Sequence, residues 1–396
     1  MTARGETRST FAAHVRVVAL LLAGDDRSAA QALADCDVDA FARFVDHNKL
    51  QFHIAALAPD SPLRSALPAV QLAAIDAYAA EQRERQGALA GELDALSDIL
   101  ESAGIDFMLL KGLYFADRFC GGVANRFSWD LDVMVRQGDA ARVDRILRRG
   151  GYFRRSAVLG SRALTSRFVH AFDYGNLRPR FSVDLHWMFS MHPSFAVDYT
   201  AVWAARESYV LLGRRFAVLS LENEIVSNTL SAFRDIQRGA IRMRSLVDIR
   251  RVLEAADGTL AWDALVERCR RERVAGIVVN VLDVLLGVLD CRERFPGAAR
   301  AAEQSRDLIV SPPQGDVATL FVPDAGALAG RRWTATIYDC SRLEVAGWWL
   351  MSLPFRMAVY KSGRRYAILK RRIHAIRLRV RERSRVRTRP VPRELP

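Results

Sequence analysis

The sequence predicts an α+β protein in which a small mixed sheet lies between two helical domains. Residues 1–103 carry apolar side chains at three-to-four spacing with few breakers, which is typical of amphipathic helices. Residues 104–200 alternate short apolar runs, rich in strand formers, with helical segments. The helical period returns over residues 201–310, and residues 311–396 contain a linker rich in Pro and Gly, followed by a basic tail.

Three segments predict helices in the N-terminal domain: residues 38–46, 51–57 and above all 69–103. Its longest early apolar run, Val15 to Gly24, is far shorter than the roughly 20 residues that cross a bilayer. Acidic residues follow that run where a signal peptide would be cleaved. The five cysteines are scattered and suit free thiols. We therefore expect a cytoplasmic protein without a transmembrane segment.

The middle domain begins as strand, turn and helix, and then repeats strand and helix. Ile105 to Leu110 forms the first apolar run, Lys111-Gly112 breaks it, and Leu113 to Phe119 resumes a helical period. Leu131 to Val135 then alternates as a strand does, and Asp139 to Arg149 is amphipathic and ends at a pair of glycines. These segments predict two strands of the sheet, each followed by a helix.

A hairpin is predicted next, from two extended runs, Ser166 to Asp173 and Arg180 to Phe189, on either side of the turn signal Gly175-Asn176. From Leu221 to Asp290 the pattern is helical, with a break at Asp257-Gly258. This second run of helices predicts the C-terminal helical domain.

The positive charge of the chain is confined to its tail. The chain has 58 basic and 45 acidic residues, and residues 356–396 contain fifteen of the basic and two of the acidic ones. The remaining 355 residues hold 43 of each sign, so the body is neutral and the tail carries the net +13. A basic groove for nucleic acid is not predicted in the body. An anionic membrane surface or another polyanion is the partner class that the tail suits, and a solvated, disordered end is the alternative.

Three aspartates are the candidate catalytic residues. Asp130 and Asp132 lie two positions apart at the head of a strand, so their side chains share one face. Carboxylates placed in this way hold Mg²⁺, and a two-metal site stabilises the attacking and leaving oxygens of a phosphoryl transfer. Asp184, in a later extended segment, supplies the third carboxylate, which binds metal or accepts the proton of the attacking hydroxyl.

The order of these motifs resembles the polymerase-β-like nucleotidyltransferase superfamily, and within it an uncharacterised bacterial nucleotidyltransferase family. A Leu-Leu-Lys-Gly element precedes an Arg and an Asp-x-Asp strand, and an acidic-Leu-His-Trp element comes later. The chain offers these at Leu109–Gly112, Arg126, Asp130–Asp132 and Asp184–Trp187, and the resemblance covers roughly residues 40 to 290.

The resemblance implies a nucleotidyltransferase core that uses two Mg²⁺ ions and a nucleoside triphosphate as donor. A helical domain would close over the nucleotide, and the nucleoside monophosphate would pass to a hydroxyl of a small molecule, a sugar or a protein. Better characterised branches carry Gly-Ser or Gly-Gly at the first turn, whereas Gly112 stands between Lys111 and Leu113. Lys111 is then the candidate phosphate ligand. The rival interpretation is a catalytically silent binding protein that its basic tail recruits to anionic partners.

Four further residues are candidates for a role in or near the site. Arg126 is either a phosphate ligand or an ion-pair partner that orients Asp130. His186 is either an acid or base in the reaction or a hydrogen-bonded core residue. Asp248 is expected to pin the helical domain to the core, and Ser128 stands close enough to the aspartates to touch a phosphate.

Overall fold

The structure is a computed structural model that describes residues 2–155, 169–176, 181–190, 192, 194–239 and 241–310, with isolated positions between 320 and 353. The predicted basic tail, residues 356–396, lies outside the described residues. None of the helices in these ranges combines the length and apolar character needed to span a lipid bilayer.

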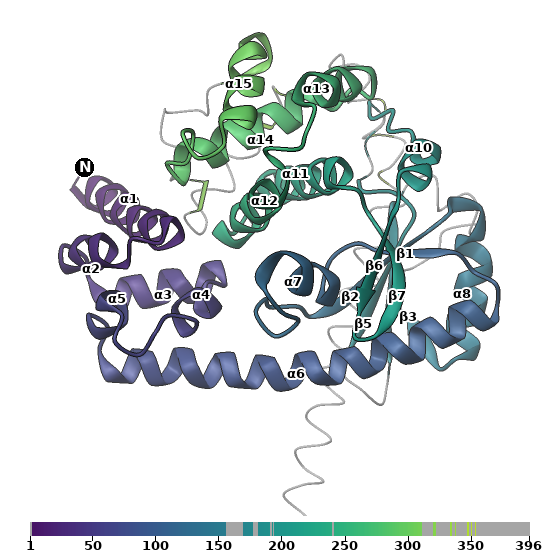
Figure 1. Cartoon of the computed structure of the whole chain (residues 1–396), viewed down its shortest axis with the longest axis horizontal. Helices are drawn as coiled ribbons and strands as arrows, with labels where there is room; N and C mark the ends of the chain where they lie inside the picture. The colour runs from purple at the N-terminus through teal and green to yellow at the C-terminus, as the bar shows by residue number, and fades with distance from the viewer. Residues whose placement is uncertain are drawn as a thin grey trace, which may run out of the picture.

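Helices fill the N-terminal part as expected. They are α1 (Thr2–Ala23), α2 (Asp26–Ala34), α3 (Val38–Asn48), α4 (Gln51–Ala55), α5 (Pro62–Ser65) and α6 (Ala69–Ser102). Asp25 and Asp37 cap α2 and α3 by accepting hydrogen bonds from backbone amides, which satisfies donors that have no partner within the helix. Helix α6 runs along the molecule from the N-terminal helices to the sheet (Figure 1), and contacts α4 as well as α7, α8 and β2.

A mixed sheet forms the centre, which confirms the α+β class. Its strands are β1 (Phe107–Leu109), β2 (Asp130–Val135), β3 (Tyr152–Arg154), β4 (Ala171–Asn176), β5 (Ser182–His186), β6 (Glu207–Leu211) and β7 (Arg214–Val218). They are ordered β3-β4-β5-β2-β1-β7-β6. Strand β2 is parallel to β5 and antiparallel to β1, so the predicted Asp-x-Asp strand occupies the middle of the sheet.

The predicted hairpin is present as the antiparallel pair β4 and β5, but its turn is not at Gly175-Asn176. Both residues belong to β4, where Gly175 pairs with Phe153 on one side and Ser182 on the other. A Cβ atom at Gly175 would lie 2.7 Å from the Phe153 ring, so the glycine makes room for a side chain of the neighbouring strand β3.

The sheet also extends past residue 200, where the sequence had suggested helices alone. Strands β6 and β7 form a hairpin, and β7 pairs in parallel with β1. Gly213 has a positive φ of 81° in the turn, a conformation that glycine adopts without strain. The domain boundary expected near residue 200 therefore separates the last two strands, β6 and β7, from the rest of the sheet. Both strands are short and partly exposed, so their sequence resembles that of a loop.

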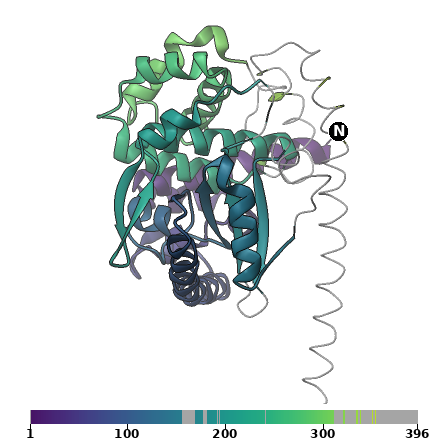
Figure 2. The ribbon, with the colours of Figure 1, turned by 90° about the vertical axis from the view of Figure 1, so that its right-hand side faces the viewer.

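Helices cover the sheet and continue after it. The connecting helices are α7 (Leu113–Cys120), η1 (Gln137–Asp139), α8 (Ala140–Arg149) and α10 (Tyr199–Ala204). The C-terminal ones are α11 (Leu221–Arg238), α12 (Met243–Ala256), α13 (Trp262–Arg271), α14 (Ala275–Val288), α15 (Pro296–Gln304) and η2 (Arg306–Leu308). Figure 2 looks nearly along α6, with the sheet and the C-terminal helices stacked above it. Helices α11 and α12 pack on each other, and α12 contacts α7.

Candidate active site

The register of two strands brings Asp132 and Asp184 together. Parallel pairing of β2 with β5 sets Asp132 opposite Asp184 and Asp130 opposite Ser182. On β2, Leu131 lies in the core and both aspartates beside it remain partly accessible, as the alternation of a strand requires. The last three residues of the strand, 133–135, are all buried. The three predicted carboxylates thus lie on adjacent strands, at the end of the sheet where β2 begins.

These carboxylates repel one another in a poorly solvated site. Burial, followed by the charge of Asp132, raises the pKa of Asp130 to about 7. Burial, followed by Asp130 and Asp132, raises the pKa of Asp184 well above its ordinary value. Burial opposes ionisation of Asp132 as well, but a hydrogen bond and charge from His186, with Lys111 and Arg126, outweigh it and lower that pKa. One carboxylate is held ionised while its neighbours resist ionisation.

Two of the three carboxylates form no ion pair with a cation in the part of the chain that the structure describes. Within the described part of the chain, the side chains of Asp130 and Asp184 take part in no hydrogen bond or ion pair. The Asp132 carboxylate lies at hydrogen-bond distance from His186, with 3.1 Å between Oδ1 and Nε2. Buried carboxylates that lack partners are costly unless a cation is bound. The donor set, carboxylate oxygens with one imidazole nitrogen, therefore fits a divalent metal ion.

The Lys111-Gly112 turn lies against this cluster. The backbone amide of Leu110 donates to the carbonyl of Asp132 at 3.1 Å, which carries the turn to the start of β2. Gly112 has a φ of 68°, and a Cβ atom there would lie 3.3 Å from the Asp130 carbonyl oxygen and 3.7 Å from Ser128 Oγ. Glycine is required at this position both by the backbone conformation and by the close approach.

Lys111 itself points toward helix α11. Its Nζ donates a hydrogen bond of 2.7 Å to Ser231 Oγ, and no carboxylate lies within 4.0 Å of it among the described residues. Burial lowers the pKa of Lys111, and the charge of Asp132 opposes that shift. The lysine is thus a desolvated cation whose present partner is neutral.

Arg126 is an ion-pair residue, but its partner is Asp248 rather than Asp130. Its guanidinium donates to both carboxylate oxygens of Asp248, at 2.9 and 2.8 Å. Burial disfavours both charges, yet their attraction outweighs it, raising the pKa of Arg126 and lowering that of Asp248. Arg126 also donates to Ser128 Oγ at 3.2 Å, so Ser128 is held toward the same site.

The loop before β2 is clamped from both sides. Phe127 packs in a small apolar cluster with Phe52 and Ala79, against Tyr78 of α6. On the other side Arg244 of α12 donates to the Phe127 carbonyl at 3.2 Å. Arg85 of α6 stacks over Trp129, the exposed residue next to Asp130, with its Cζ 4.2 Å from the ring centroid. N-terminal and C-terminal helices therefore hold the loop in place together.

A cavity of about 210 Å³ joins these groups. It is lined by Lys111, Arg126, Phe127, Ser128, Trp129, Asp130, Asp132, Asn228, Ser231, Ala232, Arg234, Asp235, Arg244, Ser245 and Asp248. Apart from Asp248, the sequence interpretation had missed the residues that α11 and α12 contribute to this cavity. Asn228, Ser231 and Asp235 recur at helical spacing along α11, and these polar residues in a largely buried helix are the signal that was available.

Two missed arginines supply further positive charge. Arg234 donates to His170 Nε2 at 2.9 Å and to Ser231 Oγ at 3.1 Å, and its nearest carboxylate, that of Asp235, is 4.0 Å away. Arg244 has no carboxylate within 4.0 Å in the described chain, and its Nε is buried without a partner. With Lys111, they bring to the cavity lined by Asp130 three cations that have no carboxylate closer than 4.0 Å in the described chain.

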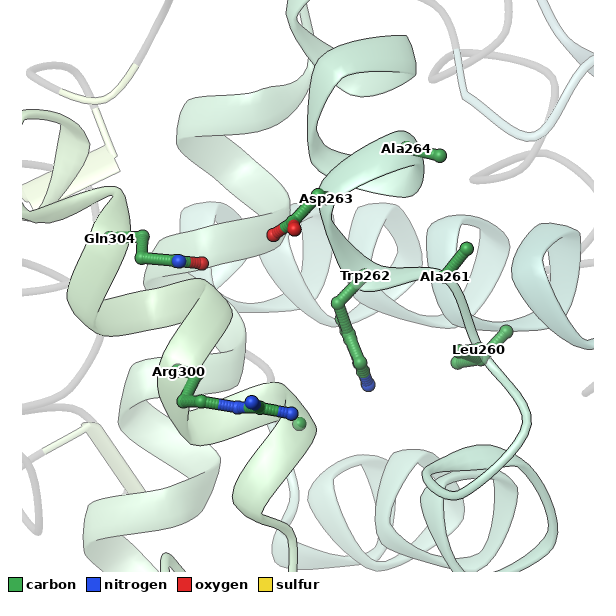
Figure 3. A pocket seen from close by; sticks show the side chains of 8 residues that line it. Leu260, Ala261, Trp262, Asp263, Ala264, Arg300 and Gln304 are labelled. Carbon is green, nitrogen blue, oxygen red and sulfur yellow. The ribbon is translucent and has the colours of Figure 1, made fainter.

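A second cavity, of about 400 Å³, lies between α13 and α15 (Figure 3). Among the described residues that line it, Asp263 is the one carboxylate, and Arg300 and Gln304 extend from α15. Because its described lining lacks two carboxylates side by side, the smaller cavity is the better candidate for a metal-binding active site.

Comparison with solved structures gives distant likenesses. A lincosamide antibiotic adenylyltransferase, LnuA, solved with lincomycin bound, matches at 14% identity and a TM-score of 0.29, over 41% of this chain and 94% of that one. An antigenic nucleotidyltransferase-like protein from Paracoccidioides brasiliensis matches at 14% identity and a TM-score of 0.29, over 56% of this chain and 92% of that one. No curated protein matches the chain.

The family comparison is more specific. The family model described as "uncharacterised nucleotidyltransferase" matches residues 34–286, close to two thirds of the chain. That range includes every site residue described above and confirms the resemblance drawn from the motifs. The chain belongs to this uncharacterised nucleotidyltransferase family.

Proposed function

We propose that the chain transfers a nucleoside monophosphate from a nucleoside triphosphate to a hydroxyl acceptor, in the cavity between β2, α11 and α12. The observation that carries this proposal is the set of charges around that cavity that lack a close partner of opposite sign. Asp130, which lines the cavity, and Asp184, on the adjacent strand β5, form no ion pair in the described chain. Lys111, Arg234 and Arg244 also line the cavity, and no described carboxylate lies closer than 4.0 Å to any of them. A complex of divalent metal with triphosphate is a ligand that neutralises both sets at once.

Asp130, Asp132 and Asp184 are the residues that would hold Mg²⁺ or a similar ion. Such an ion, when bound, supplies positive charge to the phosphate oxygens and lowers the barrier to displacement at phosphorus. Lys111, Arg234 and Arg244 bind the outer phosphates through charge-assisted hydrogen bonds. Arg126 keeps the loop and Ser128 in position through its bond to Asp248.

In the reaction the acceptor oxygen forms a bond to the α-phosphorus, and the bond from that phosphorus to the bridging oxygen breaks. Pyrophosphate leaves with that oxygen, and the hydroxyl proton passes to a carboxylate. Asp184 suits this step because it lies opposite Asp132 in the sheet and its side chain forms no hydrogen bond or ion pair within the described chain. Having two carboxylate oxygens, Asp184 can bind metal with one and accept the proton with the other.

The test is transfer of label from each α-labelled nucleoside triphosphate to panels of small molecules, sugars and proteins, with pyrophosphate release followed in parallel. Asp132→Asn is the matched control, because the change is nearly isosteric and removes one ligand charge. Label transfer that this variant abolishes, with unchanged circular dichroism, supports the proposal. Transfer by the variant at the wild-type rate refutes the mechanism. Tight metal-dependent nucleotide binding without pyrophosphate release would favour the catalytically silent binding protein instead.

A further inference from the structure

His186 lies in the group of acidic residues rather than beside it. It follows Asp184 by two residues on β5, so the two side chains share a face of the sheet. Its Nε2 lies 3.1 Å from Asp132 Oδ1. One ligand atom each of Asp132, Asp184 and His186 lies within 4.8 Å of the others, in a group to which Asp130 does not belong.

These separations match the coordination shell of one metal ion. With ligand bonds of ~2.1 Å in octahedral geometry, neighbouring ligand atoms lie ~3 Å apart and opposite ones ~4.2 Å apart. The distance from His186 Nε2 to Asp132 Oδ1 equals such a neighbouring pair. A movement of the ligand atoms by about 0.6 Å is enough to bring all three within the ~4.2 Å that separates opposite ligands.

His186 does not behave as a satisfied core histidine. It is 8% exposed, and its Nδ1 is buried with no hydrogen-bond partner in the described chain. Buried imidazole nitrogens kept for packing are normally hydrogen-bonded. The ring is therefore held mainly by the contact of Nε2 with Asp132, that is, by the edge that faces the carboxylates.

The neighbouring histidine provides a contrast. The His170 ring centroid lies 5.9 Å from that of His186, but its Nε2 accepts a hydrogen bond from Arg234 at 2.9 Å. Its lone pair is thus occupied, and it lies outside the group of potential ligands in the described residues. Of the two adjacent imidazoles, one is placed as a ligand and the other as a support for Arg234.

We propose that His186, Asp132 and Asp184 together bind one divalent ion, with the imidazole nitrogen as a direct ligand, and that this site prefers Mn²⁺ to Mg²⁺. Mg²⁺ favours oxygen ligands alone, whereas transition-metal ions accept imidazole nitrogen readily. Asp130, outside the group, remains available for a second ion beside Asp132. The inference deepens the proposed function and rests on its assignment of the metal site.

The experiment is electron spin-echo spectroscopy of Mn²⁺ bound to the full chain without nucleotide. We expect modulation from a directly coordinated ¹⁴N nucleus, which changes to the ¹⁵N pattern in uniformly labelled protein. His186→Asn should remove it and raise the Kd for Mn²⁺ at least ~10-fold, with a smaller change for Mg²⁺. His170→Asn, the matched control, should retain it. Because the wild-type spectrum decides the question by itself, a folding defect in the variant does not leave it open.

Absence of nitrogen modulation from wild-type protein with Mn²⁺ bound would overturn the inference and reduce His186 to a hydrogen-bond partner of Asp132. Equal Mn²⁺ affinity in folded His186→Asn would do the same. Label transfer without the nitrogen signal would leave the proposed function intact. A nitrogen signal without any transfer would leave the metal site intact and refute the proposed function.

Discussion

The Arg126 guanidinium and the Asp248 carboxylate, 122 residues apart in the chain, form two hydrogen bonds of 2.9 and 2.8 Å. Both residues are buried, with exposed fractions of 8% and 7%. Arg126 lies in the loop that leads into the Asp-x-Asp strand, whereas Asp248 lies in the middle of α12. The pair therefore ties the helices after the sheet directly to the loop before β2.

Asp248→Ala should destabilise the protein by about 3–5 kcal/mol, because it leaves the Arg126 charge buried without a partner. The measurement is chemical denaturation followed by circular dichroism. Glu303→Ala is the control, since it removes an exposed ion pair with Arg306 and should barely move the midpoint. A midpoint for Asp248→Ala as close to wild type as that of the control would show that the pair does not hold α12 to the loop.

The sequence predicted the elements of the site better than the contacts between them. The Asp-x-Asp alternation, the Lys-Gly break and the extended segment around Asp184 are local patterns, and each lies on the expected kind of element. The pairing of β2 with β5, which sets Asp132 opposite Asp184, depends on the order of strands in the sheet. No local period encodes that order.

Partners distant in the chain were the hardest to predict. The sequence left Arg126 open between phosphate and Asp130, because nothing near it in sequence points to α12. Ser231 and Arg234 went unnoticed because polar residues on a helix are ordinarily solvated, and only packing of α11 over the sheet turns them toward Lys111. The strand hairpin at 207–218 was missed for a related reason, since its stability comes from pairing with β1.

Loss of a cation from the cavity should weaken the binding of triphosphate and spare that of nucleoside. Arg244→Gln removes a buried guanidinium whose hydrogen bond in the described chain goes to a backbone carbonyl. A hydrogen bond between charged groups contributes ~1.5–3 kcal/mol, so the Kd for nucleoside triphosphate should rise by about 10- to 150-fold. Calorimetric titration in the presence of metal gives both constants.

Arg148→Gln serves as the matched control for charge, because Arg148 is exposed in the last turn of α8. It should leave both constants unchanged. Equal weakening of nucleoside and triphosphate binding in Arg244→Gln would show that the residue positions the loop and does not contact phosphate.

Glu224 should make stability fall as pH rises. Burial, opposed by Lys111 and Arg118, raises its pKa to about 8 from an ordinary 4.5. Between these values the folded state holds a proton that the unfolded chain has lost. The contribution of this bound proton to the free energy of unfolding is therefore fully present below pH 4.5. It is lost as pH rises toward 8, by about 1.4 kcal/mol per pH unit.

Glu224→Gln removes this titration at nearly constant volume. The free energy of unfolding of the variant should lie close to that of wild type near pH 5 and exceed it near pH 8.5. Denaturation curves recorded at both pH values measure this difference. A stability difference between the two proteins that is the same at both pH values would contradict a raised pKa. Glu222→Gln, two residues earlier on α11 at a partly buried position, is the matched variant that controls for the loss of one acidic side chain from the same helix.

Removal of residues 356–396 should abolish affinity for anionic surfaces while leaving nucleotidyl transfer and the melting temperature nearly unchanged. These residues carry the whole net charge of +13, and the rest of the chain is neutral. The electrostatic contribution to binding lipid or nucleic acid should therefore disappear with them and, in the intact chain, weaken as salt is raised. Co-sedimentation with anionic vesicles, and binding to a duplex of random sequence, at low and moderate salt, measure this for both chains. Equal binding by the two would show that the tail is not the polyanion contact, and a large fall in melting temperature on truncation would show that the tail packs on the folded body.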